Sequence, residues 1–504
     1  MPDPVDPALD GLEPQELWRQ FDAIRRIPRP SLHEEGVRTY LRGLAERQGW
    51  KVQQDAAGNL LLRVPGAGRG RNSPTLALQG HMDMVCEKDP EVVHDFHRDP
   101  IALRRTTRTI GGAAREVLQA VGTTLGSDNG LGCATALALA IVPGLDHPPL
   151  ELLFTADEEQ GMSGALALDP GLLTARRLIN FDAELEGRVY LSCAGGRELH
   201  ARWQLDREPR CHDDVALQVT ITGLRSGHSG VDIHEGRGNA IALLIQLLTD
   251  RGVDFEGVRL AHCEGGTRSN VIARQASAVL WCARARVGAL TEAMLALGER
   301  LREPYATIEP DLRITIDELP DPIADTPAVP DPISAMTGRA IFEALRLQTH
   351  GVLAWSPVIP GLVETSNNLA VLTTSEGELG LVAMARSSRH GAIEAFQDRC
   401  ERALEASGAT IEYHNAFPGW EPRPDTELVV QAKATYRELF KRDVILEAIH
   451  AGLECGILGD RVPGLEMIAF GPDIHDAHTP DESLVIDTVE PFWRYAVRLV
   501  ASLC

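Results

Sequence analysis

Apolar, strand-like segments alternate with helix-like segments at both ends of this chain, and this alternation constrains the fold more than any other feature. The strand-like segments are 75–79, 150–156, 177–181, 444–449 and 465–470. The helix-like segments are 129–142, 425–441 and 489–503. Buried strands that alternate with helices predict an α/β fold on a mostly parallel sheet, covered by helices on both faces.

The middle of the chain, residues 197–416, has a different character. Stretches such as LHARWQL and VALQVTIT alternate apolar and polar residues, as amphipathic strands do, and a helix is expected over 239–251. The segment 318–333 holds five prolines and is typical of a linker. We therefore predict an α/β domain made of 1–196 and 417–504, interrupted by a two-lobed α+β domain over 197–416.

Two local patterns predict individual elements. Ser31 and Glu34 match a capping box, and apolar residues follow at helical spacing, which predicts a helix over about 32–47. Gly58-Asn59 predicts a hairpin turn.

The charge and composition of the chain exclude several classes of partner. Its 504 residues carry a formal net charge of -23, which disfavours binding to nucleic acid or to an anionic membrane surface. No stretch approaches the roughly 20 apolar residues of a membrane helix, and the acidic, proline-rich N-terminus does not resemble a signal peptide. The nine cysteines include no CxxC motif, so we expect reduced thiols in a cytoplasmic protein.

Acidic and imidazole side chains follow the predicted strands, at the edge where α/β sheets bind ligands. They are His81, Asp83, Asp128, Glu158, Glu159, Asp182, His475, Asp476 and His478. Several carboxylates in one cleft repel each other, whereas two divalent cations with a bridging hydroxide would balance their charge. Histidine and carboxylate ligands suit zinc or manganese, with an open position for water.

Each of these residues has an ordinary structural explanation when taken alone. A histidine after a strand is usually structural, an acidic pair is usually a solvated turn, and an aspartate before a helix is usually its N-cap. Their shared position on one edge of one predicted sheet is what favours a metal site.

Several motifs resemble those of the M20 metallopeptidases, and within them the aminoacyl-histidine (cytosol non-specific) dipeptidases. In the α/β domain these motifs are LQGHMDMVCEK (78–88), GTTLGSDNGLG (122–132), LFTADEEQGMSGA (153–165), NFDAE (180–184) and AHTPDE (477–482). The others are GLRSGHSGVDIHEGRGNA (223–240), VETSNNLA (363–370) and IHAGLECGIL (449–458). The resemblance implies a di-metal hydrolase domain with an inserted lid domain, and it covers nearly the whole chain. It also implies a hairpin between Pro100 and Thr124, although that segment is more basic than such a hairpin requires.

The resemblance also implies a role for each residue of the cluster. His81 and Asp182 would hold one metal ion, Glu159 and His478 the other, and Asp128 both. The peptide bond after Asp128 is often cis in this family. Glu158 would be the general base that activates a metal-bridged hydroxide, and Asp83 would orient His81. In the insertion, His228 would steady the substrate oxygen, and Asn270 lies in a segment that resembles a substrate loop.

The implied activity is hydrolysis of dipeptides, preferentially of Xaa-His type such as β-Ala-His and Gly-His, with two divalent ions, most simply zinc, with manganese or cobalt as alternatives. Arg386, at the end of an apolar run, is our candidate for the substrate's terminal carboxylate. His234 and Arg268 are further candidates on the lid. His450 and Glu454 are candidate substrate contacts, although a structural role explains them equally well.

Three questions stay open from the sequence. The same ligands would serve an N-acyl amino acid deacylase or an aminopeptidase on longer peptides, and a non-catalytic metal-binding protein is an alternative of another class. The family resemblance implies a homodimer through the lid, where residues 239–248 could offer an apolar face, although core packing explains that pattern equally well. The native metal is not specified by the ligand types.

Overall fold

The computed structural model describes residues 5–320 and 329–504, and its internal contacts divide the chain into two compact units. Unit 1 comprises Met1–Ser192, Pro422–Ala448 and Leu453–Cys504. Unit 2 comprises Cys193–Glu421 and Ile449–Gly452. The segment Ile449–Gly452, which the sequence groups with the α/β domain, belongs to unit 2 because the N–H of Ala194 donates to the carbonyl oxygens of Ile449 and Ala451.

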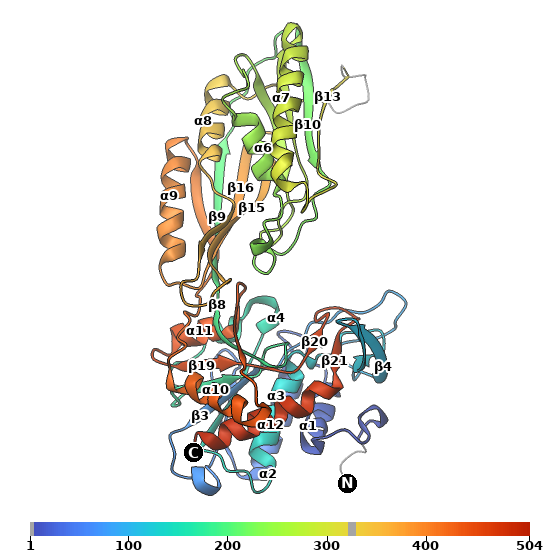
Figure 1. The fold of residues 1–504 in the computed structure, drawn as a ribbon, viewed down its shortest axis with the longest axis vertical. Coiled ribbons are helices and arrows are strands. Elements are labelled where there is room, and N and C mark those ends of the chain that lie inside the picture. The colour runs from blue at the N-terminus through green and yellow to red at the C-terminus, as the bar shows by residue number, and fades with distance from the viewer. Residues whose placement is uncertain (1–4, 321–328) are drawn as a thin grey trace. The chain divides into compact units, whose positions relative to one another are not determined.

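Unit 1 is built on an eight-stranded mixed sheet (Figure 1). In spatial order its strands are β1 (Lys51–Gln54), β2 (Leu60–Val64), β6 (Leu150–Thr155), β3 (Leu76–His81), β7 (Arg177–Asn180), β19 (Glu466–Ala469), β8 (Arg188–Cys193) and β18 (Ile445–Ile449). The four strands β6, β3, β7 and β19 run parallel, and β1, β2 and β8 pair antiparallel at the flanks. Every residue of β3 and β6 is buried, as expected of parallel strands covered on both faces.

The helices of unit 1 include α3, which packs against β3 and α1, and α10, which packs against β19 and α12. Their bounds are α1 (Gln15–Arg25), α2 (Glu35–Gln48), α3 (Ser127–Ile141), α4 (Glu158–Gly161), α5 (Ser163–Leu166), α10 (Glu427–Phe440), α11 (Glu454–Arg461) and α12 (Ile486–Ser502). Helix α3 is buried along most of its length, because its alanine and glycine residues allow close approach to the sheet.

A separate four-stranded sheet in unit 1 explains the basic segment near residue 110. Its order is β20 (Ile474–His475), β21 (Ser483–Val485), β5 (Ala113–Ala120) and β4 (Leu103–Ile110). The expected hairpin is therefore confirmed as β4 and β5. Arg108 forms an ion pair with Asp476 at 2.6 Å, and Arg115 forms one with Asp487. The arginines thus attach the hairpin to an acidic segment near the C-terminus.

Unit 2 contains a nine-stranded antiparallel sheet, with helices packed against it (Figure 1). Its path is β13 (Arg313–Glu318), β10 (Asp214–Thr222), β12 (Ala276–Ala283), β11 (Arg259–Gly265), β15 (Val363–Thr374), β16 (Glu378–Ser387), β9 (Gly195–Gln204) and β17 (Thr410–Phe417), with β14 (Gly351–Trp355) paired to β15. The helices are α6 (Ala240–Thr249), α7 (Val287–Arg302), α8 (Ala335–Arg346) and α9 (Ala392–Ala406).

Most predicted elements are confirmed within a few residues. The two halves of the insertion share one sheet, because β11 pairs with β15 at Gly265 and Leu372. Much of the expected linker, 321–328, lies outside the described residues. The predicted capping box is wrong, since the N-cap of α2 is Glu34 and Ser31 binds elsewhere.

Candidate metal centre

The parallel strands of unit 1 bring the predicted acidic and imidazole residues to one edge of the sheet. Strand β3 ends at His81, which is in register with Thr155 at the end of β6, shortly before Glu158 and Glu159. Strand β7 ends just before Asp182. The carboxyl ends of these strands meet because parallel strands point the same way.

Asp128 lies between two histidines that come from distant parts of the chain. Its Oδ1 is 2.9 Å from Nε2 of His81, and its Oδ2 is 3.1 Å from Nε2 of His478. His478 Nε2 also lies 2.9 Å from Oε2 of Glu159. A carboxylate that faces a different ligand group with each of its two oxygens can bridge two metal ions.

Asp182 completes the side of the cluster that His81 occupies. Its Oδ1 is 3.5 Å from Nε2 of His81 and accepts a hydrogen bond of 2.6 Å from the side-chain amide of Asn129. The same amide donates to the carbonyl oxygen of Phe181 at 2.9 Å. The peptide bond between Asp128 and Asn129 is cis, as the family resemblance implies.

Asp83 organises more of the site than its expected contact with His81. Its Oδ1 lies 3.3 Å from Nδ1 of His81, a close charge contact without good hydrogen-bond alignment. Its two oxygens also accept 3.1 Å hydrogen bonds from the backbone N–H groups of Glu158 and Glu159, and Ser31 donates its hydroxyl at 2.7 Å. Asp83 is fully buried and therefore fixes the start of helix α4, which carries both glutamates.

The local surroundings shift the pKa values of Glu158 and Asp83 in opposite directions. Burial raises the pKa of Glu158 well above its usual range; the charge of His81 opposes this rise, and those of Asp182 and Glu454 add to it. Burial would also raise the pKa of Asp83, but its contacts with His81, Ser31 and the N–H of Glu158 hold that pKa well below the usual range. Glu158 is thus the carboxylate of the two that readily holds a proton.

The residues present fit divalent metal ions. Ligand atoms of His81, Asp128 and Glu159 all lie within 4.8 Å of one another. Among the described residues, no hydrogen-bond partner reaches the buried Oε1 of Glu159. A buried carboxylate oxygen without a partner is costly unless a cation or donor meets it, and imidazole with carboxylate oxygen is a donor set that zinc, manganese and cobalt accept.

Left-handed backbone marks the loops that carry these residues. Asp157, Asp476 and His478 have φ values of 54°, 53° and 66°, a region that residues other than glycine seldom adopt. Asp157 directly precedes Glu158, and Asp476 shares a loop with His478. Such conformations cluster at functional sites because the surrounding structure holds them there.

In unit 2, His228 has a defined tautomer. Its Nδ1 accepts hydrogen bonds of 3.1 Å from the backbone N–H groups of Gly230 and Val231, which leaves the proton on Nε2. Burial and the charge of Arg386 lower the pKa of His228. His228 is therefore a neutral side chain that can donate a hydrogen bond from Nε2.

Arg386 is buried, at 5% exposure, without a counter-ion. Within residues 5–320 and 329–504 no acceptor reaches its Nε, and no carboxylate lies within ion-pair distance. Burial lowers its pKa to about 10, so the guanidinium remains charged at neutral pH. A buried, unpartnered cation is expensive, which favours an anionic ligand at this position.

The remaining candidates of unit 2 surround His228. Asn270 accepts a backbone hydrogen bond of 2.8 Å from Ser229, and a side chain at Gly230 would lie 2.2 Å from the carbonyl oxygen of His450. His450 Nε2 is 2.7 Å from the hydroxyl of Ser366. His234 and Arg268 also lie in this region; Nδ1 of His234 contacts the carbonyl oxygen of Val231, and the carbonyl oxygen of Arg268 accepts from Val271.

Glu454 lies in unit 1, whereas His450 belongs to unit 2. Its Oε2 accepts 2.7 Å hydrogen bonds from the side chains of Gln79 on β3 and Thr155 on β6. Burial raises its pKa to about 7, with the charge of His81 opposing. Its negative charge also raises the pKa of Glu158.

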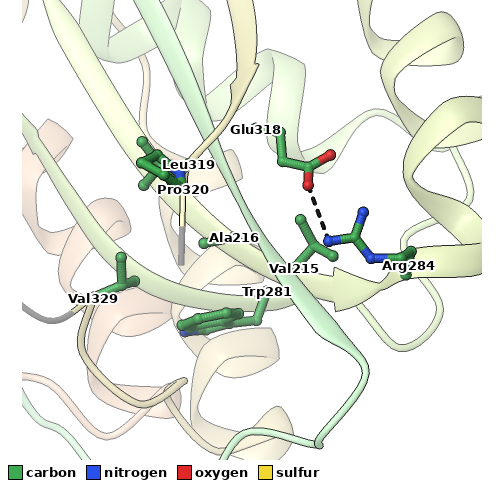
Figure 2. A pocket seen from close by; sticks show the side chains of 8 residues that line it. All are labelled: Val215, Ala216, Trp281, Arg284, Glu318, Leu319, Pro320 and Val329. Atoms are coloured by element: carbon green, nitrogen blue, oxygen red, sulfur yellow. Dashed lines mark hydrogen bonds and ion pairs between the residues drawn. The ribbon is translucent and has the colours of Figure 1, made fainter. Parts of the chain in front are cut away.

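A cavity of about 240 Å³ in unit 2 has no such unsatisfied chemistry (Figure 2). Its lining includes Trp281, Arg284 and Glu318. Arg284 pairs with Glu318 at 3.1 Å, and Trp281 donates to the carbonyl oxygen of Pro330. Each of these polar groups therefore has a partner, so we place no function in this cavity.

Three residues of the site were not predicted from the sequence. Asn129 holds Asp182, Ser31 holds Asp83, and Glu482 binds the turn before Asp128. Glu482 and Asn129 lie within the motifs AHTPDE and GTTLGSDNGLG, so the sequence places both of them close to predicted metal ligands. Ser31 had no comparable signal.

Comparison with known proteins supports the same reading. Residues 77–502 match the model of peptidase family M20/M25/M40. The cytosol non-specific dipeptidase of Escherichia coli strain K12 is 35% identical over 98% of this chain and 99% of its own. The crystal structure of aminoacylhistidine dipeptidase from Vibrio alginolyticus is similar with a TM-score of 0.90 and 35% identity over 98% of each chain.

A more distant structure shares the fold alone. Aminopeptidase PepT from Bacillus cereus has a TM-score of 0.54 at 15% identity, over 98% of this chain and 99% of that one. Among the helices that the structure describes, none has the length and apolar character needed to cross a membrane.

Proposed function

This chain belongs to peptidase family M20/M25/M40, and from that membership we propose that it is a dinuclear metallodipeptidase, with a preference for Xaa-His dipeptides such as β-Ala-His and Gly-His. The observation that carries the proposal is Asp128, whose two oxygens face His81 and His478 separately. A carboxylate shared in this way suits two ions better than one.

The ligand assignment follows the contacts within unit 1. His81 and Asp182 hold one ion, Glu159 and His478 hold the other, and Asp128 belongs to both. Zinc is the simplest choice, and manganese and cobalt suit the same donors. Bound there, two divalent ions would polarise the scissile carbonyl and lower the pKa of water.

Glu158 is the proton carrier of the proposed reaction. Its raised pKa suits a carboxylate that takes a proton from the attacking water and passes it to the leaving amine. The backbone N–H of Glu158 donates a hydrogen bond to Asp83 and fixes the start of its helix. Asp83, which also contacts His81, therefore helps to position Glu158. Glu454 contributes by charge, which favours the protonated form of Glu158.

Unit 2 contributes two groups in this proposal. His228 donates from Nε2 to the substrate oxygen as negative charge develops on it. Arg386 binds the terminal carboxylate, a planar anion that a guanidinium can meet with two hydrogen bonds. We assign Asn270 and His450 to substrate positioning around His228.

The proposal includes a cytoplasmic homodimer formed through unit 2. Helix α6 does not supply the dimer surface, because most of its apolar residues, including Ile241, Leu243 and Leu244, are buried in the core of unit 2. Mixing a Glu158→Gln subunit with a His228→Ala subunit tests the assembly. Activity well above that of either variant alone would mean that His228 acts across the dimer, and no recovery would mean that it acts within its own chain.

A substrate panel with metal analysis tests the function itself. The panel contains β-Ala-His, Gly-His, Ala-Ala, tripeptides and N-acetyl amino acids, and products are separated by liquid chromatography. We expect two metal ions per chain and fastest turnover of Xaa-His dipeptides. Preferred turnover of N-acetyl amino acids or tripeptides would replace the dipeptidase assignment with another activity of the family, and metal binding without turnover would remove the enzyme assignment.

A further inference from the structure

Glu482 is a buried carboxylate that binds the turn leading into Asp128. Its Oε2 accepts from the backbone N–H groups of Leu125 and Gly126 at 2.7 and 2.9 Å. Its Oε1 accepts from the N–H of Ser127 at 2.8 Å, from the Ser127 hydroxyl at 2.6 Å and from the N–H of Asp128 at 3.3 Å. Consecutive N–H groups that converge on one carboxylate fix the backbone of that turn.

The turn is held from its opposite side as well. Arg29, which is fully buried, donates to the carbonyl oxygen of Gly126, and its other amino group donates to the carbonyl oxygens of Met82 and Asp83. Gly126 has a φ of 67°, and a side chain there would lie 2.5 Å from the Arg29 guanidinium. The position of Asp128 therefore depends on charged groups that never contact its carboxylate.

Glu482 shares a short, internally bonded loop with His478. The N–H of Glu482 donates to the carbonyl oxygen of Thr479 at 3.0 Å, and the Thr479 hydroxyl donates to the carbonyl oxygen of Asp476 at 2.8 Å. Gln119 on β5 donates to the carbonyl oxygen of Asp481 at 3.2 Å. These hydrogen bonds connect Glu482 to the loop that carries His478, so fixing Glu482 against the 125–128 turn also restrains His478.

We propose that Glu482 is a positioning residue that sets the spacing between Asp128 and His478, and through that spacing the affinity for the metal ion that these two residues share with Glu159. The inference rests on the proposed function, since it concerns the same ions. Glu482 touches none of the ligand side chains in this role; it aligns two ligands that lie on separate segments of the chain.

The test measures metal affinity directly. Metal-depleted wild-type protein and the Glu482→Gln variant are titrated with Mn²⁺ by calorimetry. Glutamine keeps the size of the side chain but turns an amide NH₂ toward backbone N–H groups. We expect the affinity for the ion shared with Glu159 to weaken by about 10- to 100-fold in the variant, and the affinity for the other ion, which Asp128 also holds, to weaken less. Ser127→Ala, which removes one hydrogen bond and no charge, should cause a smaller loss of affinity for the ion shared with Glu159.

Glu151→Gln is the matched control. Glu151 is equally buried in unit 1 and accepts backbone hydrogen bonds from Thr174 and Ala175, but it lies near the beginning of β6, whereas the site follows the end of that strand. It should lose thermal stability and keep both metal affinities. The inference is overturned if Glu482→Gln binds both ions like the wild type, or if Glu151→Gln loses the same affinity. A wild-type protein that binds no ions would instead overturn the proposed function.

Discussion

His478 Nε2 lies 3.1 Å from Oδ2 of Asp128, although 350 residues separate the two in the chain. The approach depends on the return of the chain to the α/β sheet after the insertion, where β19 pairs in parallel with β7. The proposed ligands of the second metal ion therefore come together only when both ends of the chain have folded into one domain. The following predictions test what this arrangement does.

Replacing Glu158 by Gln should lower kcat by about 10²- to 10⁴-fold, the usual contribution of a general base. The variant keeps the backbone hydrogen bond to Asp83, so the ligands around it should stay in place. Elemental analysis should still find two metal ions per chain, and KM should change little. A variant with near-normal kcat would show that another group carries the proton.

Replacing Arg386 by Met should weaken substrate use and stabilise the free protein. The loss of a charge-assisted contact predicts a fall of roughly 100-fold in kcat/KM for a dipeptide, but little change for the same dipeptide with an amidated C-terminus. Removal of a buried, unpaired cation should raise the free energy of unfolding by about 1–3 kcal/mol. An equal fall for both substrates would argue against carboxylate recognition.

Replacing Asp83 by Asn should reduce metal affinity by about 10- to 100-fold, because asparagine has one acceptor oxygen where two backbone N–H groups need two. Equilibrium dialysis against buffered Zn²⁺ measures the effect. Asp55→Asn is a suitable control: Asp55 also accepts a backbone hydrogen bond, from Asn59, in the hairpin of β1 and β2. Similar losses in both variants would indicate general destabilisation only.

His450 should make the protein less stable in mild acid. Burial, with the charge of Arg386, lowers its pKa to about 3 in the folded state, against about 6.5 when unfolded. The unfolded chain therefore binds the extra proton, and stability falls as pH decreases from 6.5 toward 3, by about 1.4 kcal/mol per pH unit. Urea unfolding should show this slope reduced in His450→Gln; an unchanged slope would mean that His450 is already charged when folded.

Removal of metal by a chelator should abolish activity and lower the melting temperature. Ions that bind only the folded state stabilise it, by about 2.7 kcal/mol each at one hundred times the dissociation constant. Readdition of zinc, manganese or cobalt should restore both properties, and the metal that restores most activity at equal occupancy identifies the effective cofactor. Full activity after chelation, with no metal detected, would contradict the proposed centre.

Much of the fold follows from patterns that are local in the sequence. Fully apolar runs gave the parallel strands, and the residues directly after them gave the acidic and imidazole cluster, because strand direction alone brings those positions to one edge. The arrangement of the strands in the insertion was harder to predict from the sequence. Within the described residues, the pairing of β11 with β15 at Gly265 and Leu372 joins its two halves into one sheet, and no local signal marks such a long-range pair.

The supporting residues were less predictable than the ligands for the same reason. Ser31 and Glu34 satisfy the local rule for a capping box, yet Ser31 donates to Asp83 and Glu34 accepts from the N–H groups of Leu32 and Asp157. In the folded protein, these hydrogen bonds replace the capping contacts that the local sequence predicts for both side chains. A motif can predict which side chain binds an ion, but the group that holds that side chain is selected by the folded neighbourhood.

The left-handed backbone at His478 has a dynamic consequence. Such a conformation costs a non-glycine residue about 1–2 kcal/mol, and a metal ion bound by the imidazole, in addition to its contacts with Asp128 and Glu159, would help to offset that cost. Without an ion, residues 476–482 should open more often than the adjoining sheet and exchange their amide hydrogens faster. Loading the centre should slow this exchange, so that segment would report occupancy by mass spectrometry without any substrate.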